Sequence, residues 1–192
     1  PMLRKFLLET SILAELTPEL CKAVTNHIDA PIILEEIYRR NLFIDAVDDA
    51  VLPIYRYQAL FVEFLRRQLV REQPDQLTEL HRRAATAHTI PAQKIAHYLA
   101  AEQWEAAAQV IEQIAESIYS QGLLDRLQGW IQALPTAVRK NHPWLLYYLS
   151  VCVWGEGQFN ETQRLLQEAL AGFEATADDK GRGETMVQLS IV

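Results

Sequence analysis

The chain of 192 residues lacks most of the features that mark secreted, membrane-bound or metal-binding proteins. It has only two cysteines, Cys21 and Cys152, and neither has a Cys or His partner at the spacing of a metal site. We therefore expect two free thiols in a reducing cytosol instead of a disulfide. No apolar run approaches the roughly 18 residues of a membrane span, and Glu9 interrupts the apolar stretch that a secretory signal would need. These absences predict a cytoplasmic protein with no membrane partner.

An excess of basic charge is also missing. The chain has 25 acidic and 18 basic residues, which gives a formal net charge of −7. This balance disfavours direct binding of nucleic acid through bulk electrostatics. Local basic groups occur at residues 66, 67 and 71 and at residues 82 and 83, and we interpret them as solvated helix faces.

Motifs for catalysis, cofactors and metals are scarce. No Gly-x-x-x-x-Gly-Lys-Ser/Thr sequence is present, so this chain has no phosphate-binding P-loop. His81 and His88 are seven residues apart, whereas helical metal ligands usually lie three or four apart. The pairs Asp48-Asp49 and Asp178-Asp179 fall in predicted turns, and turn chemistry explains them. We predict no catalytic, cofactor-binding or metal-binding residue in this chain and no enzyme activity.

The first part of the chain has an ordered pattern of helices and strands. Three short helices are expected, because Thr17 with Pro18 and Asp29 before Pro31 are typical helix starts. Two β-rich segments, residues 42–47 and 51–57, surround an acidic turn and predict a hairpin. A helix over residues 59–71 follows. Three helices and a hairpin are the outline of a winged-helix-like domain, which we assign to residues 1–72.

The remainder, residues 73–192, predicts helices alone. Prolines 74, 91 and 143 mark helix starts, and residues 123–141 predict an irregular helix pair. Two helical hairpins share a pattern in which a bulky residue after a turn precedes a small residue and then apolar positions. The corresponding pairs are Trp104 with Phe159, Ala107 with Thr162, Ile111 with Leu166, and Ile114 with Ala169. The copies are 55 residues apart, so we predict a mainly α fold with a degenerate tetratricopeptide-like superhelix, truncated at its C-terminal end.

The second half also concentrates aromatic and exposed apolar residues. We predict a candidate ligand or partner surface at Trp130, Tyr147, Tyr148 and Trp154. The alternative is that these aromatics fill helix–helix interfaces, which is their usual role. Residues 178–183 predict a polar turn, and residues 184–192 begin a helix with no following partner. Its apolar side chains predict a homodimer contact through Met186, Val187, Leu189 and Ile191.

Several ordered segments resemble the central region, winged helix plus helical repeats, of MalT-type regulators. These are LuxR-family transcriptional regulators of the STAND ATPase class. The segments that carry the resemblance span roughly residues 3–175: FLLETSIL from Phe6, LEEIYRRNLF from Leu34, YRYQALFVEFLR from Tyr55, LHRRAA from Leu80, IAHYLAA from Ile95, and WEAA from Trp104.

The resemblance implies a function that composition and spacing do not reveal. It implies an upstream nucleotide-binding domain that uses ATP and Mg²⁺, and a DNA-binding effector domain elsewhere in the parent protein. This chain would be a non-catalytic sensor arm that couples the nucleotide-binding domain to a ligand or partner on the helical repeats. Candidate interdomain contacts are Tyr55, Arg56, Tyr57 and Gln58.

One departure from the family pattern lies in the same segment. Many relatives have His after Tyr-Arg-Tyr, where this chain has Gln58 and Ala59. A nucleotide contact is therefore not carried over to this position. Two other readings stay open: a free-standing helical-repeat scaffold that binds another protein, and a winged-helix module that binds DNA through the helix at residues 32–41.

Overall fold

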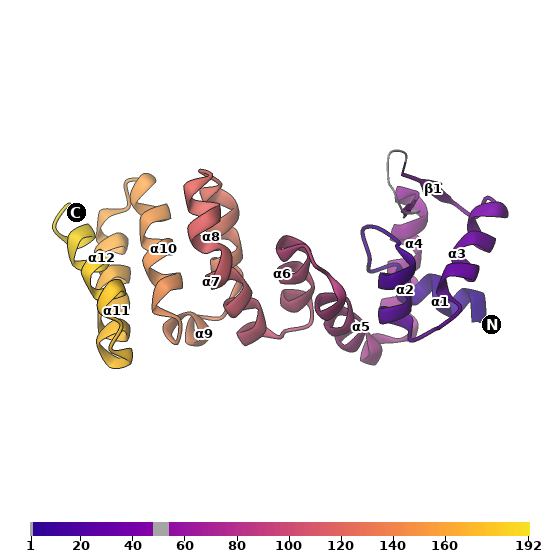
Figure 1. Cartoon of the computed structure of the whole chain (residues 1–192), viewed down its shortest axis with the longest axis horizontal. Coiled ribbons are helices and arrows are strands. Elements are labelled where there is room, and N and C mark those ends of the chain that lie inside the picture. Colours follow the sequence, from indigo (N-terminus) through magenta and orange to yellow (C-terminus); the bar gives the residue numbers. More distant parts are fainter. Residues whose placement is uncertain (1, 48–53) are drawn as a thin grey trace. The chain divides into compact units, whose positions relative to one another are not determined.

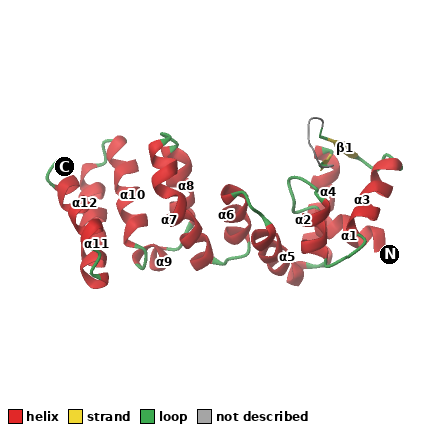
Figure 2. Cartoon of the chain, viewed as in Figure 1, coloured by secondary structure: helices red, strands yellow, loops and turns green. Residues whose placement is uncertain are grey.

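The computed structural model describes residues 2–47 and 54–192, and helices dominate it (Figure 2). The elements, in chain order, are α1 (Met2–Thr10), α2 (Pro18–Thr25), α3 (Ala30–Arg39), β1 (Ile44–Ala46), β2 (Tyr55–Tyr57), α4 (Ala59–Glu72), α5 (Pro74–Ala87), α6 (Pro91–Ala100), α7 (Trp104–Ser120), α8 (Leu124–Ala133), α9 (Thr136–Lys140), α10 (Pro143–Gly155), α11 (Phe159–Thr176) and α12 (Asp179–Leu189). The predicted mainly α fold, with a winged helix followed by helical repeats, is confirmed. Within the described ranges, no helix has both the length and the apolar character needed to span a membrane.

The chain packs as two compact units, Pro1–Glu102 and Gln103–Val192, called here the first and second unit. Helices α5 and α6 belong to the first unit, because α5 packs against α2 and α6 packs against α5. The division by packing therefore falls later than the boundary drawn between residues 72 and 73. The domain boundary between residues 72 and 73 stays a prediction.

The first unit begins with three helices and a hairpin (Figure 1). Thr17 caps α2, since its hydroxyl accepts a hydrogen bond from the backbone N–H of Leu20 at 3.2 Å. Strands β1 and β2 pair antiparallel, with Ile44 opposite Tyr57. Leu16, between α1 and α2, forms a further antiparallel bridge to Tyr55. The hairpin is thus held to the helices by backbone bonds, while its predicted acidic turn at residues 48–50 lies outside the described residues.

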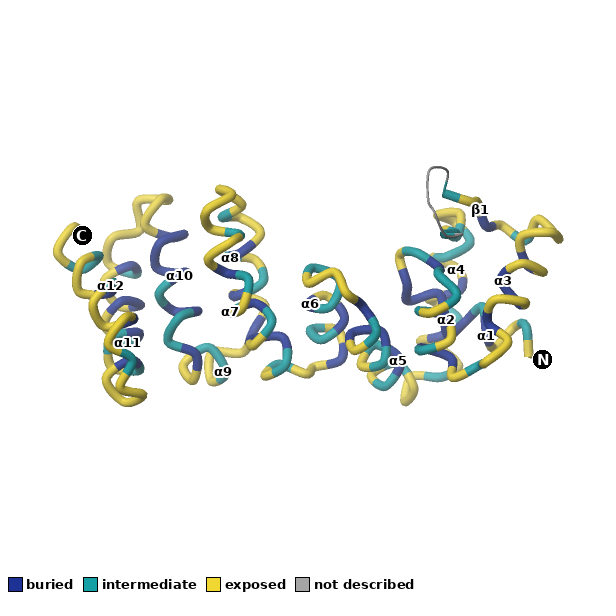
Figure 3. Tube along the Cα trace, viewed as in Figure 1, coloured by how far each residue is buried: buried dark blue, intermediate teal, exposed yellow. Residues whose placement is uncertain are grey.

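A single apolar core joins these elements. Its buried residues come from α1 to α5 and from β1, and Figure 3 colours the buried residues of these elements dark blue. The largest fully buried members include Phe6, Leu16, Leu34, Ile37 and Leu69. The spacing of Leu34 and Ile37 in α3, three residues, puts both on one helix face. Burial of that face fixes α3 against the rest of the winged helix.

The second unit is a series of helices in which each packs on its neighbours. Contacts join α7 with α8, α8 with α10, α10 with α11, and α11 with α12. Ala107 and Thr162, the small residues of the predicted repeat pattern, are both fully buried. The backbone repeats as well: Gln103 before α7 and Gln158 before α11 have nearly identical dihedral angles, φ −85°, ψ 63° and φ −86°, ψ 63°. The residues before them, Glu102 and Gly157, both have positive φ.

The predicted turn at residues 178–183 is wrong. Helix α12 begins at Asp179, because Asp178 caps it by accepting a hydrogen bond from the Gly181 backbone N–H at 2.9 Å. Gly181 lies against Phe173, where an added Cβ would approach the ring to 2.4 Å. This glycine therefore permits close helix packing and does not mark a turn. Met186 and Val187 of α12 and Ile191 after it are exposed as expected, whereas Leu189 at the end of α12 is half-buried.

Candidate functional site

The four predicted interdomain residues make contacts inside the first unit. The Tyr57 hydroxyl lies 2.7 Å from Thr10 Oγ1, and burial raises the pKa of this tyrosine. Arg56 pairs with Glu15 at 2.5 Å, and Gln58 Nε2 donates to Asp45 Oδ1 at 3.3 Å. Tyr55 pairs with Ala46 and Leu16 through its backbone. Contacts of these residues with another domain stay a prediction.

Helix α3, the candidate DNA-reading helix, has its basic side chains neutralised on the same face. Arg39 pairs with Glu35 at 3.6 Å and Arg40 pairs with Glu36 at 2.5 Å. A helix that reads DNA presents free basic and polar groups to the phosphates and base edges. This charge arrangement disfavours the DNA-binding alternative.

The structure brings together two of the four predicted surface aromatics. Tyr147 and Tyr148 are in contact on α10, with ring centroids 5.5 Å apart. They join Trp144, which is not one of the four predicted surface residues, although its spacing of three and four residues from the tyrosines indicates a shared helix face. In the described part of the chain, Trp130 and Trp154 form no aromatic pair with this group.

The aromatic group is largely an interface between helices. Trp144 of α10 packs on Phe173 of α11 at 4.9 Å between ring centroids, and its indole N–H donates to Asp178 at 2.9 Å. Tyr148 contacts Tyr119 of α7, and burial, with nearby Glu116, raises the Tyr148 pKa to about 12. This packing matches the interface alternative for these residues. Ligand binding at the predicted surface stays a prediction.

Three histidines that sequence reasoning did not bring together lie where α5 packs on α6; His88 and His97 are buried and His81 is half-buried. His81 and His97 are joined by a hydrogen bond of 2.8 Å between their Nδ1 atoms, and His88 stacks on His97 at 5.1 Å. Burial lowers the pKa of all three. That of His97 falls to about 3, because burial is reinforced by repulsion from Arg66 and, once they are protonated, from His81 and His88. The rings are therefore neutral at pH 7. Within the described residues, no group of His, Cys, Asp or Glu is arranged to hold a metal ion.

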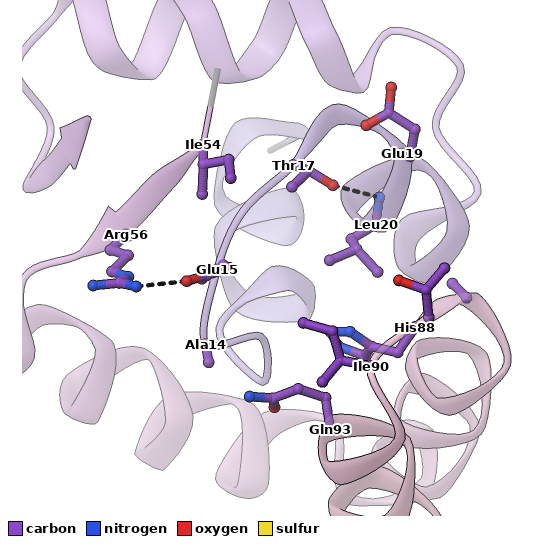
Figure 4. A pocket seen from close by; sticks show the side chains of 12 residues that line it. Ala14, Glu15, Thr17, Glu19, Leu20, Ile54, Arg56, His88, Ile90 and Gln93 are labelled. Carbon is purple, nitrogen blue, oxygen red and sulfur yellow. Dashed lines mark hydrogen bonds and ion pairs between the residues drawn. The ribbon is translucent and has the colours of Figure 1, made fainter. Parts of the chain in front are cut away.

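Beside this histidine group the first unit has a cavity of about 560 Å³, shown in Figure 4. Its walls come from the α1–α2 connection and the start of α2, from β2 and the residue before it, and from the α5–α6 connection with the adjoining ends of α5 and α6. Such a volume is typical of small-molecule sites. The lining residues are Ala14, Glu15, Thr17, Glu19, Leu20, Ile54, Arg56, Ala87, His88, Thr89, Ile90 and Gln93. Of these, the sequence had singled out Arg56 for contacts with another domain; the cavity itself was not foreseen.

The sequence is similar to a known domain family and to known regulatory proteins. The family described as the MalT winged helix domain matches residues 1–77. The HTH-type transcriptional regulator MalT of Klebsiella pneumoniae (strain 342) is 29% identical over 184 residues, which cover 94% of this chain and 20% of the relative. The protein of the same name from Vibrio parahaemolyticus serotype O3:K6 is 28% identical over 169 residues, 86% of this chain and 19% of the relative.

The chain thus spans about a fifth of the length of the curated relatives it matches. The matched family is a winged-helix domain and the relatives are transcriptional regulators. Residues 1–77 thus match the MalT winged helix domain, and 94% of the chain is similar to a region of MalT-type transcriptional regulators.

Proposed function

We propose that this chain is the non-catalytic signalling arm of an ATP-dependent, LuxR-family transcriptional regulator in the bacterial cytoplasm. The first unit would contact a nucleotide-binding domain that uses ATP and Mg²⁺, and the second would receive a ligand or partner protein. The observation that carries this proposal is the ordered similarity of 94% of the chain to MalT regulators. The two-unit construction supports it, since a winged helix is followed by a helical array with a repeated backbone pattern.

Signals would act by population shift. A ligand on the helical repeats changes the balance between two arrangements of the parent protein only if it binds one arrangement more tightly. Arg56 and Gln58 are suited to reporting such a change, because both side chains are exposed and, among the residues that the structure describes, Arg56 bonds Glu15 and Gln58 bonds Asp45 by side-chain contacts alone. A neighbouring domain can therefore compete for them at small cost to the fold.

The scaffold alternative has a specific observation in its favour. Helix α12 packs against α11 but exposes Met186 and Val187, and Ile191, just after the helix, is exposed as well. Such a face suits a protein partner or a second copy of the chain. A scaffold that only binds a partner would show no response to nucleotide, and this separates it from the signalling arm.

The test uses the intact regulator with single exposed substitutions. Gln58→Ala should change the rate of nucleotide exchange, and Trp154→Ala should change the response to inducer, each by roughly fivefold or more. Gln163→Ala, exposed on α11, is the matched control and should change neither. Normal exchange and normal inducer response in both variants would contradict the signalling-arm proposal. A mobility shift of duplex DNA by this chain alone would instead favour the DNA-binding reading.

A further inference from the structure

The first unit has a second cavity, of about 440 Å³, which is lined by α4, α5, α6 and the connection between α1 and α2. It shares only Ala14 and Gln93 with the cavity of Figure 4. Its volume lies in the range of small-molecule sites. Apolar side chains supply much of its wall, and these include Ile12, Leu69, Val70 and Leu77. The cavity is therefore suited to the apolar body of a small molecule.

Arg66 brings a positive charge to this cavity. Its Nε donates to Ser11 O at 2.8 Å, which holds one side of the guanidinium. Among the described residues, no carboxylate lines the cavity and none forms an ion pair with Arg66, whereas the adjacent Arg67 pairs with Glu63 at 3.6 Å. The Nη atoms of Arg66 thus remain able to donate to a bound molecule. A guanidinium binds carboxylates well, because its planar N–H groups match the two carboxylate oxygens.

His81 and His97 bring two ring nitrogens to the same cavity. Their Nδ1 atoms are hydrogen-bonded to each other at 2.8 Å, which leaves the Nε2 atoms for other partners. In the part of the chain that the structure describes, neither Nε2 has a hydrogen-bond partner, and neither is enclosed as Nε2 of His88 is. A neutral imidazole has one N–H. The ring that donates through Nδ1 therefore has no hydrogen on Nε2, and the other ring has an Nε2–H donor.

The electrostatic surroundings of the two rings indicate which charge a ligand should have. Burial is the largest cause that lowers the pKa of His81 and His97, and the charge of Arg66 lowers the pKa of both further. Within the described residues, no carboxylate raises the pKa of either ring, although two carboxylates do so at His142 of the second unit. The cavity thus combines a guanidinium with an N–H donor and has no anion of its own. Such a site attracts an anion and repels a cation.

We propose that this cavity binds a small organic carboxylate with an apolar body. One carboxylate oxygen accepts hydrogen bonds from the Arg66 guanidinium, and the other accepts from the Nε2–H of the pair His81 and His97. The apolar body lies against Leu69 and Leu77. The bound carboxylate would connect α4 with α5 and α6 inside the first unit. This site is separate from the ligand surface proposed for the second unit.

The experiment is a titration of the 192-residue chain with hexanoate and with phenylacetate, followed by imidazole NMR signals and by calorimetry. At least one acid should shift the signals of His81 and His97 with saturation. The matching neutral amide, and acetate, should each bind roughly tenfold more weakly, since the amide lacks the charge and acetate lacks the apolar body. Arg66→Gln should weaken binding by roughly tenfold or more, while Arg67→Gln, the adjacent exposed change, should leave it unchanged.

Three results would overturn the proposal. One is the absence of a saturable shift with both acids at about 10 mM, a concentration above the range of weak specific sites. Another is binding of the amide or of acetate as tight as that of the longer acid. The third is unchanged binding by a folded Arg66→Gln variant. The ligand comparisons use the unsubstituted chain, so they decide the proposal even where Arg66→Gln fails to fold.

Discussion

Each of the two units is stabilised internally by a different kind of contact. In the first unit, polar contacts join segments that are far apart in sequence: Arg66 Nε donates to Ser11 O at 2.8 Å, and Arg4 pairs with Glu72 at 2.6 Å. In the second, helices pack mainly on their neighbours in the chain. The first unit should therefore lose its structure as a whole, whereas the second can lose structure at one end, as repeat arrays do.

The histidines of the two units also lie in different surroundings. His81, His88 and His97 of the first unit are neutral and pack on one another beside Arg66. His142 of the second unit lies between two carboxylates, at 2.9 Å from Glu105 and 3.0 Å from Glu112. The units should consequently respond to acid in opposite directions.

The largest expected effect comes from a matched pair of core truncations, Phe6→Ala in the first unit and Phe173→Ala in the second. Both side chains are buried, and each change should destabilise its unit by about 3–5 kcal/mol. Hydrogen exchange should rise throughout α1 to α5 after Phe6→Ala, but mainly in α10 to α12 after Phe173→Ala. If hydrogen exchange became faster throughout the affected unit in both variants, the predicted difference between the units would be wrong.

Acidification should weaken the first unit next. Its histidines have pKa values below the unfolded value of about 6.5, so their contribution is complete above that pH and is lost as the pH falls toward their folded values. Between pH 6.5 and 5, His97 alone accounts for a loss of about 2 kcal/mol in the free energy of unfolding, because its folded pKa is about 3. The carboxylate of Glu15 opposes the lowering of the pKa at His88. Exchange of α5 and α6 amides at the two pH values measures this loss. A His97→Gln variant with an unchanged pH dependence would contradict it.

The second unit should show the opposite trend at smaller size. Burial lowers the pKa of His142, but hydrogen bonds and charge from Glu112 and Glu105 outweigh burial, and the net pKa is raised. Its contribution is therefore complete below pH 6.5 and is lost as the pH rises through the folded pKa. All four tryptophans lie in this unit, so their fluorescence follows its unfolding alone. The His142→Gln variant is the control and should unfold with no such dependence.

The smallest effect concerns one hydrogen bond across the first unit. Tyr57→Phe removes the hydroxyl that lies 2.7 Å from Thr10 Oγ1, and it should destabilise the unit by about 1 kcal/mol. Tyr55→Phe is the matched control, since no hydrogen bond of the Tyr55 hydroxyl is found within the described residues, and a smaller effect is expected. Denaturant unfolding followed by exchange in α1 and β2 compares the two. A larger loss from Tyr55→Phe would show that the Thr10 contact does not hold the hairpin.

Much of the fold follows from local patterns. Thr17-Pro18 predicts the start of α2, and Asn41, shortly after α3, adopts the left-handed conformation that is typical of a residue following a helix. The repeat pattern of Ala107 and Thr162 corresponds to two fully buried positions. The turn expected at residues 178–183 was wrong, because close packing of Gly181 on Phe173 outweighs the low helix propensity of glycine.

The sites depend on contacts that no local pattern contains. His81 and His97 meet only because α5 packs on α6, and Glu15 meets Arg56 only because the α1–α2 connection pairs with β2. The cavity therefore has no signal in residue spacing. Apolar periodicity and capping residues act over a few positions. They determined where the helices lie in the sequence and that a winged helix precedes the helical repeats. Tertiary packing alone decided which buried polar atoms found partners, because those partners lie tens of residues away in the chain.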